Sequence, residues 1–168
     1  KINLELYPGE IVGLIGPNGS GKSTLYGSII GQYKVDGGSI FLSQKDITSK
    51  PIHERAKLGI AYLSQYRSVF NMTVYDNIFL GIEENYYGII GKQNTKLFND
   101  LDQKIGFNLD PNQKVSSLRI ADQQKVEIIR ALARNAKVII MDEPTSSLTN
   151  DEVIKLHDLM NKLKKSGY

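Results

Sequence analysis

The sequence of 168 residues has no cysteine, which excludes disulfide bonds and thiolate metal sites. Its net charge is only +3, and the cations are scattered except for Lys162, Lys164 and Lys165, so no dense positive surface for nucleic acid is expected. No apolar run reaches the roughly 18 residues of a membrane span, and the N-terminal KINLELYPGE lacks a signal-peptide core. What remains is a chain long enough for one globular domain and too short for two ordinary ones.

Strand-like and helix-like segments alternate along the chain. The apolar runs IVGLIG (11–16) and VIIMD (138–142) are typical of strands covered on both faces. Between them lie a glycine turn at 37–38, another apolar segment at 59–63 and a middle region with helical spacing from about 66 to 136. This order predicts an α/β fold with a mostly parallel sheet and helices packed on it.

Two helix starts are encoded by residues three positions apart. Thr73 with Asp76 predicts an N-cap and its box partner, opening a short helix that runs through Phe79. Thr149 followed by Glu152 predicts a second capping box.

Residues 16–24, GPNGSGKST, match the pattern G-x-x-x-x-G-K-[ST] between an apolar segment and a helical one. Glycines in this loop allow backbone angles that turn several N–H groups inward, which forms a nest for phosphate oxygens at a helix N-terminus. Lys22 is expected to reach the β- and γ-phosphates, and the Ser23 hydroxyl to bind Mg²⁺. The alternative, a glycine-rich turn that merely reverses the chain, is disfavoured by the flanking segments. The predicted nucleotide-binding residues are Gly16, Pro17, Asn18, Gly19, Ser20, Gly21, Lys22, Ser23 and Thr24.

A second chemical motif, VIIMDEP (138–144), places two carboxylates after a predicted strand. Because neighbouring side chains of a strand diverge, Asp142 and Glu143 are expected to serve different groups. Asp142 is predicted to hold the Mg²⁺ water shell, and Glu143 to orient or deprotonate the water that attacks the γ-phosphate. Taken alone, an apolar strand that ends in acidic residues is common in proteins. Its occurrence together with a phosphate-binding loop is what indicates a site for metal and water.

Together, GPNGSGKST and VIIMDEPTSSLT resemble the Walker A, Walker B and D-loop segments of an ATP-binding cassette, the nucleotide-binding domain of ABC transporters. GIAYLSQ (59–65) resembles the strand that ends in the Q-loop glutamine. Three further segments resemble the ATPases of bacterial simple-sugar importers of the ribose, galactose and xylose type: MTVYDNIFLG (72–81), QQKVEIIRAL (123–132) and TSSLTNDEV (145–153).

The resemblance covers nearly the whole chain and implies a P-loop NTPase (RecA-like) core with an inserted helical subdomain. The core is expected at about 1–65 and 137–168, and the subdomain with the signature segment at about 66–136, within a single cassette domain. The family's adenine-stacking aromatic and switch histidine would lie beyond the two ends, so a fragment truncated at both ends is expected. Tyr7 and Tyr26 do not stand at the aromatic's position.

The stretch SLRIADQQ (117–124) stands where the family has its signature, LSGGQ or looser variants such as LSIGQ and LSVAQ. Family cassettes dimerise head to tail, and each signature closes over the ATP held by the other. The resemblance therefore implies that this segment forms half of an ATP site whose other half lies on a second cassette. Arg119 replaces the signature serine and Asp122 the glutamine, and the longer arginine predicts slow turnover of the nucleotide that this segment closes. The implied signature residues are Leu118, Arg119, Ile120, Ala121 and Asp122.

Other positions acquire roles only through the resemblance. Gln65 is implied to meet Mg²⁺ or its water and to couple nucleotide state to a membrane subunit; by itself it is a polar loop residue. His53 and His157 match no family position and are expected at the surface or in packing. The D-loop residues are Ser146, Ser147, Leu148 and Thr149, the last of which stands where many members have aspartate. The aromatic residues expected to receive a coupling helix, with at least one of them exposed, are Tyr66, Phe70, Tyr75 and Phe79.

The implied function is the ATP-binding and ATP-hydrolysing subunit of an importer for a sugar or related small solute, with ATP and Mg²⁺. Expected partners are a second cassette, possibly fused in the same chain, transmembrane permease subunits and, indirectly, a solute-binding protein, but no nucleic acid. The expected location is the cytoplasmic face of the cell membrane. One alternative is a soluble cassette ATPase of DNA repair or translation, which lacks a supporting coiled-coil insertion or basic patch. Another is a regulatory module that binds ATP without turnover, which Arg119 favours and Glu143 opposes.

Overall fold

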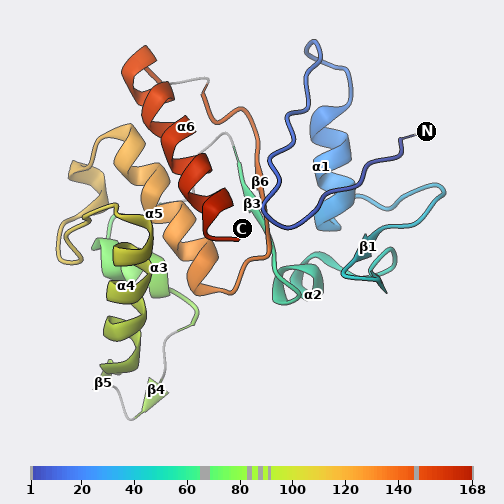
Figure 1. Ribbon diagram of the computed structural model, residues 1–168. Helices are drawn as coiled ribbons and strands as arrows, with labels where there is room; N and C mark the ends of the chain where they lie inside the picture. The colour runs from blue at the N-terminus through green and yellow to red at the C-terminus, as the bar shows by residue number, and fades with distance from the viewer. Residues whose placement is uncertain are drawn as a thin grey trace.

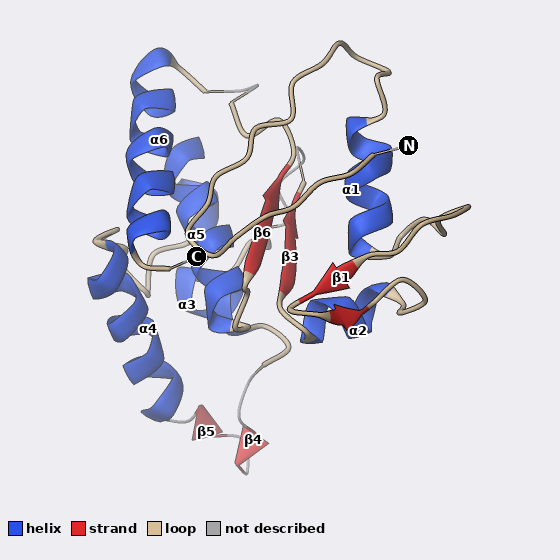
Figure 2. Ribbon diagram, turned by 45° about the vertical axis from the view of Figure 1, so that its right-hand side comes forward, coloured by secondary structure: helices blue, strands red, loops and turns tan. Residues whose placement is uncertain are grey.

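The computed structural model describes residues 2–64, 69–82, 85–86, 89–90, 92–145 and 148–167. Two parallel strands, β3 (Ile60–Leu63) and β6 (Val138–Met141), lie at its centre, with Tyr62 opposite Ile140. Helices α5 (Ile120–Ala133) and α6 (Asn150–Lys165) lie on one side of this pair, and α1 (Lys22–Ile30) lies on the other (Figures 1 and 2).

Other elements surround this centre. The helices are α2 (Ile52–Lys57), α3 (Val74–Phe79), α4 (Lys92–Ile105) and a 3₁₀ turn at Val115–Ser117. The remaining strands form two antiparallel pairs, β1 (Phe41–Leu42) with β2 (Lys45–Asp46) and β4 (Asn85–Tyr86) with β5 (Ile89–Ile90). Within the described ranges no helix combines the length and apolar character needed to cross a bilayer.

The central strands send alternate side chains into two separate hydrophobic clusters. Leu63, Ile139 and Met141 pack against the larger cluster, whereas Tyr62 and Ile140 pack against the smaller one. This is the two-residue period of a strand covered on both faces. The strand predicted at VIIMD is confirmed, and the apolar segment at 59–63 forms β3.

The larger cluster, called the helical core here, is built mainly from α3, α4, α5 and α6. Both predicted helix starts are confirmed. The Thr73 hydroxyl accepts from the Asp76 backbone N–H at 3.1 Å, and α3 ends at Phe79 as expected. A capping box joins Thr149 to Glu152 at the start of α6.

The helical core contains residues from both parts of the predicted domain division. Leu156, Leu159 and Leu163 of α6 join the same cluster as the helices of the predicted helical subdomain, although α6 belongs to the predicted P-loop core. The division near residues 65 and 137 stays a prediction.

One prediction of secondary structure is wrong. Residues 11–16 form no strand, and Ile15 is fully exposed while Ile11 and Val12 are partly so. Among the described residues only β3 and β6 form a parallel ladder, so the central sheet is smaller than predicted. The physical reason is that no described strand offers its backbone groups to this segment, and both hydrophobic clusters form without it.

Candidate nucleotide-binding site

The predicted phosphate loop leads directly into α1. Gly19 and Gly21 have φ of 79° and 93°, in the left-handed region that glycine adopts at no steric cost. Gly21 is the N-cap of α1, so the helix begins at Lys22 and its first N–H groups face the loop. The other loop residues, Pro17, Asn18 and Ser20, are exposed, as are Ser23 and Thr24 in the first turn.

Lys22 folds its side chain back across this loop. Its Nζ donates to the carbonyl oxygens of Gly16 at 2.7 Å and Pro17 at 3.0 Å. A side chain at Gly16 would crowd the Ser20 hydroxyl, since an added Cβ would lie 2.8 Å from it. The loop thus places an ammonium group beside the positive end of a helix, an arrangement that attracts anionic oxygens.

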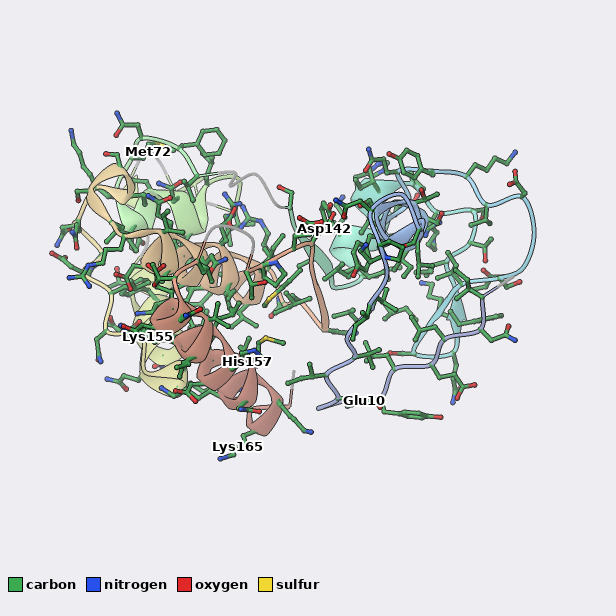
Figure 3. The ribbon with its side chains drawn as sticks, turned by 90° about the horizontal axis from the view of Figure 1, so that it is seen from above. Glu10, Met72, Asp142, Lys155, His157 and Lys165 are labelled. Atoms are coloured by element: carbon green, nitrogen blue, oxygen red, sulfur yellow. The ribbon has the colours of Figure 1, made fainter. Side chains whose placement is uncertain are left out.

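Asp142 joins the loop to the central strands. It follows β6 and lies between the helices on one side and α1 on the other (Figure 3). The Ser23 hydroxyl donates to Asp142 Oδ2 at 3.4 Å, and the Tyr62 hydroxyl donates to the same oxygen at 2.9 Å. The structure therefore brings together Ser23 and Asp142, two of the three residues predicted to bind metal.

The donor set fits Mg²⁺, which prefers oxygen ligands and keeps waters or phosphate oxygens in its shell. Ser23 and Asp142 supply one hydroxyl and one carboxylate. Within the described ranges no group of three or more histidine, aspartate or glutamate side chains gathers as a protein-only cage. One hydroxyl and one carboxylate leave most of a Mg²⁺ shell to phosphate oxygens and water, so this pair suits a metal ion that arrives with a nucleotide.

Two tyrosines adjoin the Asp142 carboxylate. Burial, and then the hydrogen bond to Asp142, raise the pKa of Tyr62 to about 12. Burial, with the Asp142 charge as the second cause, also raises the pKa of Tyr26. Both phenols are therefore neutral at ordinary pH, and Tyr62 keeps the proton that it donates. Sequence reasoning missed Tyr62; the available signal was its place on the β3 face opposite to that of Leu63.

Glu143 adopts an uncommon backbone conformation. Its φ is 45°, in the left-handed region that non-glycine residues rarely occupy, and its side chain is exposed. Gln124 of α5 donates through Nε2 to the Pro144 carbonyl at 2.9 Å. The helix that begins with the predicted signature therefore holds the turn that carries Glu143, a link that sequence reasoning did not assign.

The predicted signature residues lie at the start of α5. Arg119 is the N-cap residue, and its carbonyl accepts from the N–H groups of Asp122 and Gln123 at 3.0 Å each. Its exposed side chain forms no capping hydrogen bond in the described part of the chain. Asp122 forms an ion pair with Lys125 at 2.6 Å, which offsets part of its negative charge. Ile120 is exposed, whereas Leu118 and Ala121 are half-buried.

The remaining residues of the predicted Q-loop and D-loop are only partly described. Gln65, Tyr66, Ser146 and Ser147 lie outside the described residues. Leu148 packs against the helical core, and Thr149 caps α6.

The aromatic set and the histidines follow their predictions. Phe70 is 51% exposed, which confirms that at least one of the aromatic set is at the surface, while Tyr75 is half-buried and Phe79 is buried. His53 and His157 are both exposed, as predicted. His157 lies on α6, away from Asp142 (Figure 3).

The family model described as ABC transporter matches residues 1–146. The chain belongs to this ABC transporter family. It is 40% identical over 172 residues to the ribose import ATP-binding protein RbsA of Clostridium perfringens. It is 39% identical over 169 residues to the galactofuranose transporter ATP-binding protein YtfR of Escherichia coli K12. Each alignment covers 99% of this chain and 34% of the relative, so the cassette spans about a third of their length.

Solved structures agree with the α/β P-loop fold. cbiO1 from Clostridium perfringens, part of an ABC transporter complex, superposes with a TM-score of 0.85 at 25% identity, covering 98% of this chain and 66% of that one. The cassette MJ0796, a dimer bound to ADP and Pi in a post-hydrolysis state, gives 0.75 at 28% identity, covering 98% and 74%. The predicted fold class and the resemblance to sugar-importer ATPases are confirmed.

Proposed function

We propose that this cassette binds MgATP at residues 16–24 and hydrolyses it within a bacterial importer for a sugar or related small solute. The observation that carries the proposal is the hydrogen bond between Ser23 and Asp142, which are 119 positions apart in sequence. It joins a phosphate-binding loop to a carboxylate beside the central strands, as a metal held with nucleotide phosphates requires.

Each residue of the site has a defined part in this reaction. The loop N–H groups and Lys22 would hold the β- and γ-phosphates, and Ser23, Asp142 and Gln65 would hold Mg²⁺ or its waters. Bound Mg²⁺ would neutralise phosphate charge. Glu143 would orient the attacking water and accept its proton as the water oxygen bonds to the γ-phosphorus. The bond from that phosphorus to the β–γ bridging oxygen breaks, which yields ADP and phosphate.

The proposed assembly supplies the other half of the site. Leu118–Asp122 and the D-loop Ser146–Thr149 would face the nucleotide of a second cassette arranged head to tail. The dimeric structure of the cassette MJ0796 with ADP and Pi supports the pairing of two cassettes. Permease subunits would receive the cassette near exposed Phe70 at the cytoplasmic face of the membrane, and a solute-binding protein would act through them. The names of the ribose and galactofuranose relatives support a sugar cargo.

A second candidate function is a regulatory module that binds nucleotide without turnover. The exposed Arg119 side chain at the start of α5 favours it, because a long cation there would hinder the close approach of a helix N-terminus to phosphate. Glu143, an exposed carboxylate directly after Asp142, favours the ATPase instead, because hydrolysis needs a group that takes the proton of the attacking water and nucleotide binding alone does not.

Calorimetric titration of this chain with MgATP tests the proposal. We expect weak, saturable binding that Lys22→Ala weakens by at least about tenfold through loss of a charge-assisted contact. Lys165→Ala, in the last turn of α6, should leave binding unchanged. Turnover by the chain alone should be slow, because a second copy can close its site only with the segment Leu118–Asp122, in which Arg119 stands where the family has serine. Absence of binding, or equal binding by Lys22→Ala, would contradict the proposed site.

A second measurement separates the two candidate functions. The full transporter with both cassettes should hydrolyse ATP, and Glu143→Gln should abolish that turnover while keeping nucleotide bound. An assembled transporter that binds ATP at Lys22 without any turnover would support the regulatory module.

A further inference from the structure

Asp142 Oδ2 receives two hydroxyl groups from different elements. Tyr62 of β3 donates to it at 2.9 Å, and Ser23 of α1 donates at 3.4 Å. Resting on the proposed function, we propose that Tyr62 is a positioning residue for the metal site. Its phenol holds the Asp142 carboxylate in the orientation that faces Ser23.

The position of Tyr62 in the sheet makes it suited to this part. It lies opposite Ile140, two residues before Asp142, in the parallel register. Its ring packs with Ile140 against the smaller hydrophobic cluster, which fixes the direction of the hydroxyl. A phenol on a packed ring is a more rigid donor than a serine or lysine, because its oxygen cannot move without the ring.

The Asp142 side chain needs a second hydrogen bond to fix its orientation. The Asp142 backbone N–H still donates to the Leu63 carbonyl at 3.0 Å. Strand β6 itself ends at Met141, so the Asp142 side chain lies past the end of the strand, next to the phosphate-binding loop. The contact with Ser23 is long, and a carboxylate held by that contact alone could rotate about its side-chain bonds. Tyr62 supplies the shorter of the two hydrogen bonds and so limits this rotation.

Tyr26 offers a matched comparison. It lies on α1 in the turn that follows Ser23 and is close enough for the Asp142 charge to affect its hydroxyl. Within the described part of the chain no hydrogen bond joins it to Asp142. Removing the Tyr26 hydroxyl therefore changes the polarity of the same surroundings without releasing the carboxylate.

The test measures how strongly a metal ion promotes nucleotide binding. ADP affinity is determined by calorimetry in EDTA and at saturating Mn²⁺, and the ratio of the two affinities defines the metal coupling. Tyr62→Phe keeps the ring and removes one oxygen. We expect it to leave ADP affinity in EDTA unchanged and to lower the metal coupling about 3–10-fold, as for the net contribution of one ordinary hydrogen bond. Tyr26→Phe should change neither quantity.

Electron paramagnetic resonance of bound Mn²⁺ gives a readout that a purely structural role would not move. With ADP present, Tyr62→Phe should leave more free Mn²⁺ than the unsubstituted chain at equal concentrations, while circular dichroism melting shows the same fold. Equal metal coupling in Tyr62→Phe and the unsubstituted chain would overturn the inference alone. Tighter coupling in Tyr62→Phe would overturn it too, because the hydroxyl would then compete with the metal. Failure of the unsubstituted chain to bind ADP under either condition would overturn the proposed function as well.

Discussion

The two faces of the β3–β6 pair are held by different forces. Among the described residues, seventeen buried apolar side chains form the helical core on one face, whereas Ile30, Ile47 and Ile60 form the buried centre of the other. With so small a buried centre, the second face relies on directed polar contacts: those of Lys22 with its loop, of Asp142 with two hydroxyls, and of Arg55 with four carbonyls. The face that carries the proposed nucleotide site is thus the one with little core, where geometry depends on a few hydrogen bonds.

The strongest test of this difference removes one isoleucine side chain from each face and compares the loss in the free energy of unfolding. Ile78 in the helical core and Ile47 in the smaller cluster are 0% and 1% exposed. Ile78→Ala should lower the free energy of unfolding by about 3–4 kcal/mol, because dense surroundings cannot collapse into the cavity. Ile47→Ala should cost about 2 kcal/mol, since its smaller cluster can relax. Urea denaturation followed by circular dichroism measures both, and equal losses would contradict the difference.

Removal of a buried polar side chain tests the other face. Arg55 is 2% exposed, and its guanidinium donates to the carbonyls of Ser28 and Ile29 at the end of α1 and to those of Thr48 and Lys50 after β2. Arg55→Met fills similar volume but leaves these carbonyls without their donor. We expect a loss of about 2–3 kcal/mol in the free energy of unfolding, comparable to a core deletion.

The control for Arg55 lies nearby on the surface. Lys50 forms an ion pair with Glu54 at 2.6 Å, and both side chains are partly exposed. Lys50→Met should change stability by less than about 1 kcal/mol, as exposed pairs usually do. If Lys50→Met cost as much as Arg55→Met, burial of the guanidinium would not be what stabilises this face.

Contacts within a few residues could be predicted from the sequence. Thr73 and Thr149 each begin a helix where expected, and α1 begins at Lys22 directly after the glycine loop. A cap or a glycine turn is decided by neighbours three or four positions away, so the sequence alone contains the information. The acidic end of the VIIMD strand was likewise predictable, because a strand and its end are local features.

Contacts that need a partner elsewhere in the chain could not be predicted. The apolar run 11–16 has the composition of a buried strand, but composition does not say which segment covers it. The bond from Tyr62 to Asp142 joins residues 80 positions apart and depends on the register of β3 with β6. The bond from Gln124 to Pro144 depends on how α5 packs beside β6. Register and packing are set by the whole fold.

The start of α5, where the predicted signature lies, offers a smaller test. Arg119 occupies the N-cap without a capping hydrogen bond from its side chain in the described part of the chain. Arg119→Ser introduces a hydroxyl that can accept from the first-turn N–H groups, so stability should rise by about 1 kcal/mol. Arg119→Ala removes the same cation without supplying a cap and should give no such gain. Thermal melting distinguishes the two.

The same substitution also tests the steric prediction for the signature. In a transporter with two cassettes, Arg119→Ser should speed turnover of the nucleotide that this segment closes. Site-resolved trapping of ADP with vanadate shows which Walker A retains nucleotide. A loss of activity would instead mean that the guanidinium assists the reaction as an arginine finger does.

The smallest expected effect concerns acid stability at the start of α6. Glu152 Oε2 accepts from the Thr149 backbone N–H at 2.9 Å and from its hydroxyl at 3.1 Å, and the backbone bond is the main reason that the pKa of Glu152 is lowered. Since folding lowers this pKa, the carboxylate stabilises the folded state at pH above the unfolded value of about 4.3, and that stabilisation is lost as pH falls through the folded value. Glu152→Gln keeps an acceptor but cannot titrate, so its free energy of unfolding should fall less steeply below pH 4.3 than that of the unsubstituted chain. Thr149→Val removes only the hydroxyl and should retain most of the pH dependence, because the larger contribution comes from the backbone. Equal acid slopes for Glu152→Gln and the unsubstituted chain, from urea denaturation at stepped pH, would contradict this account of the capping box.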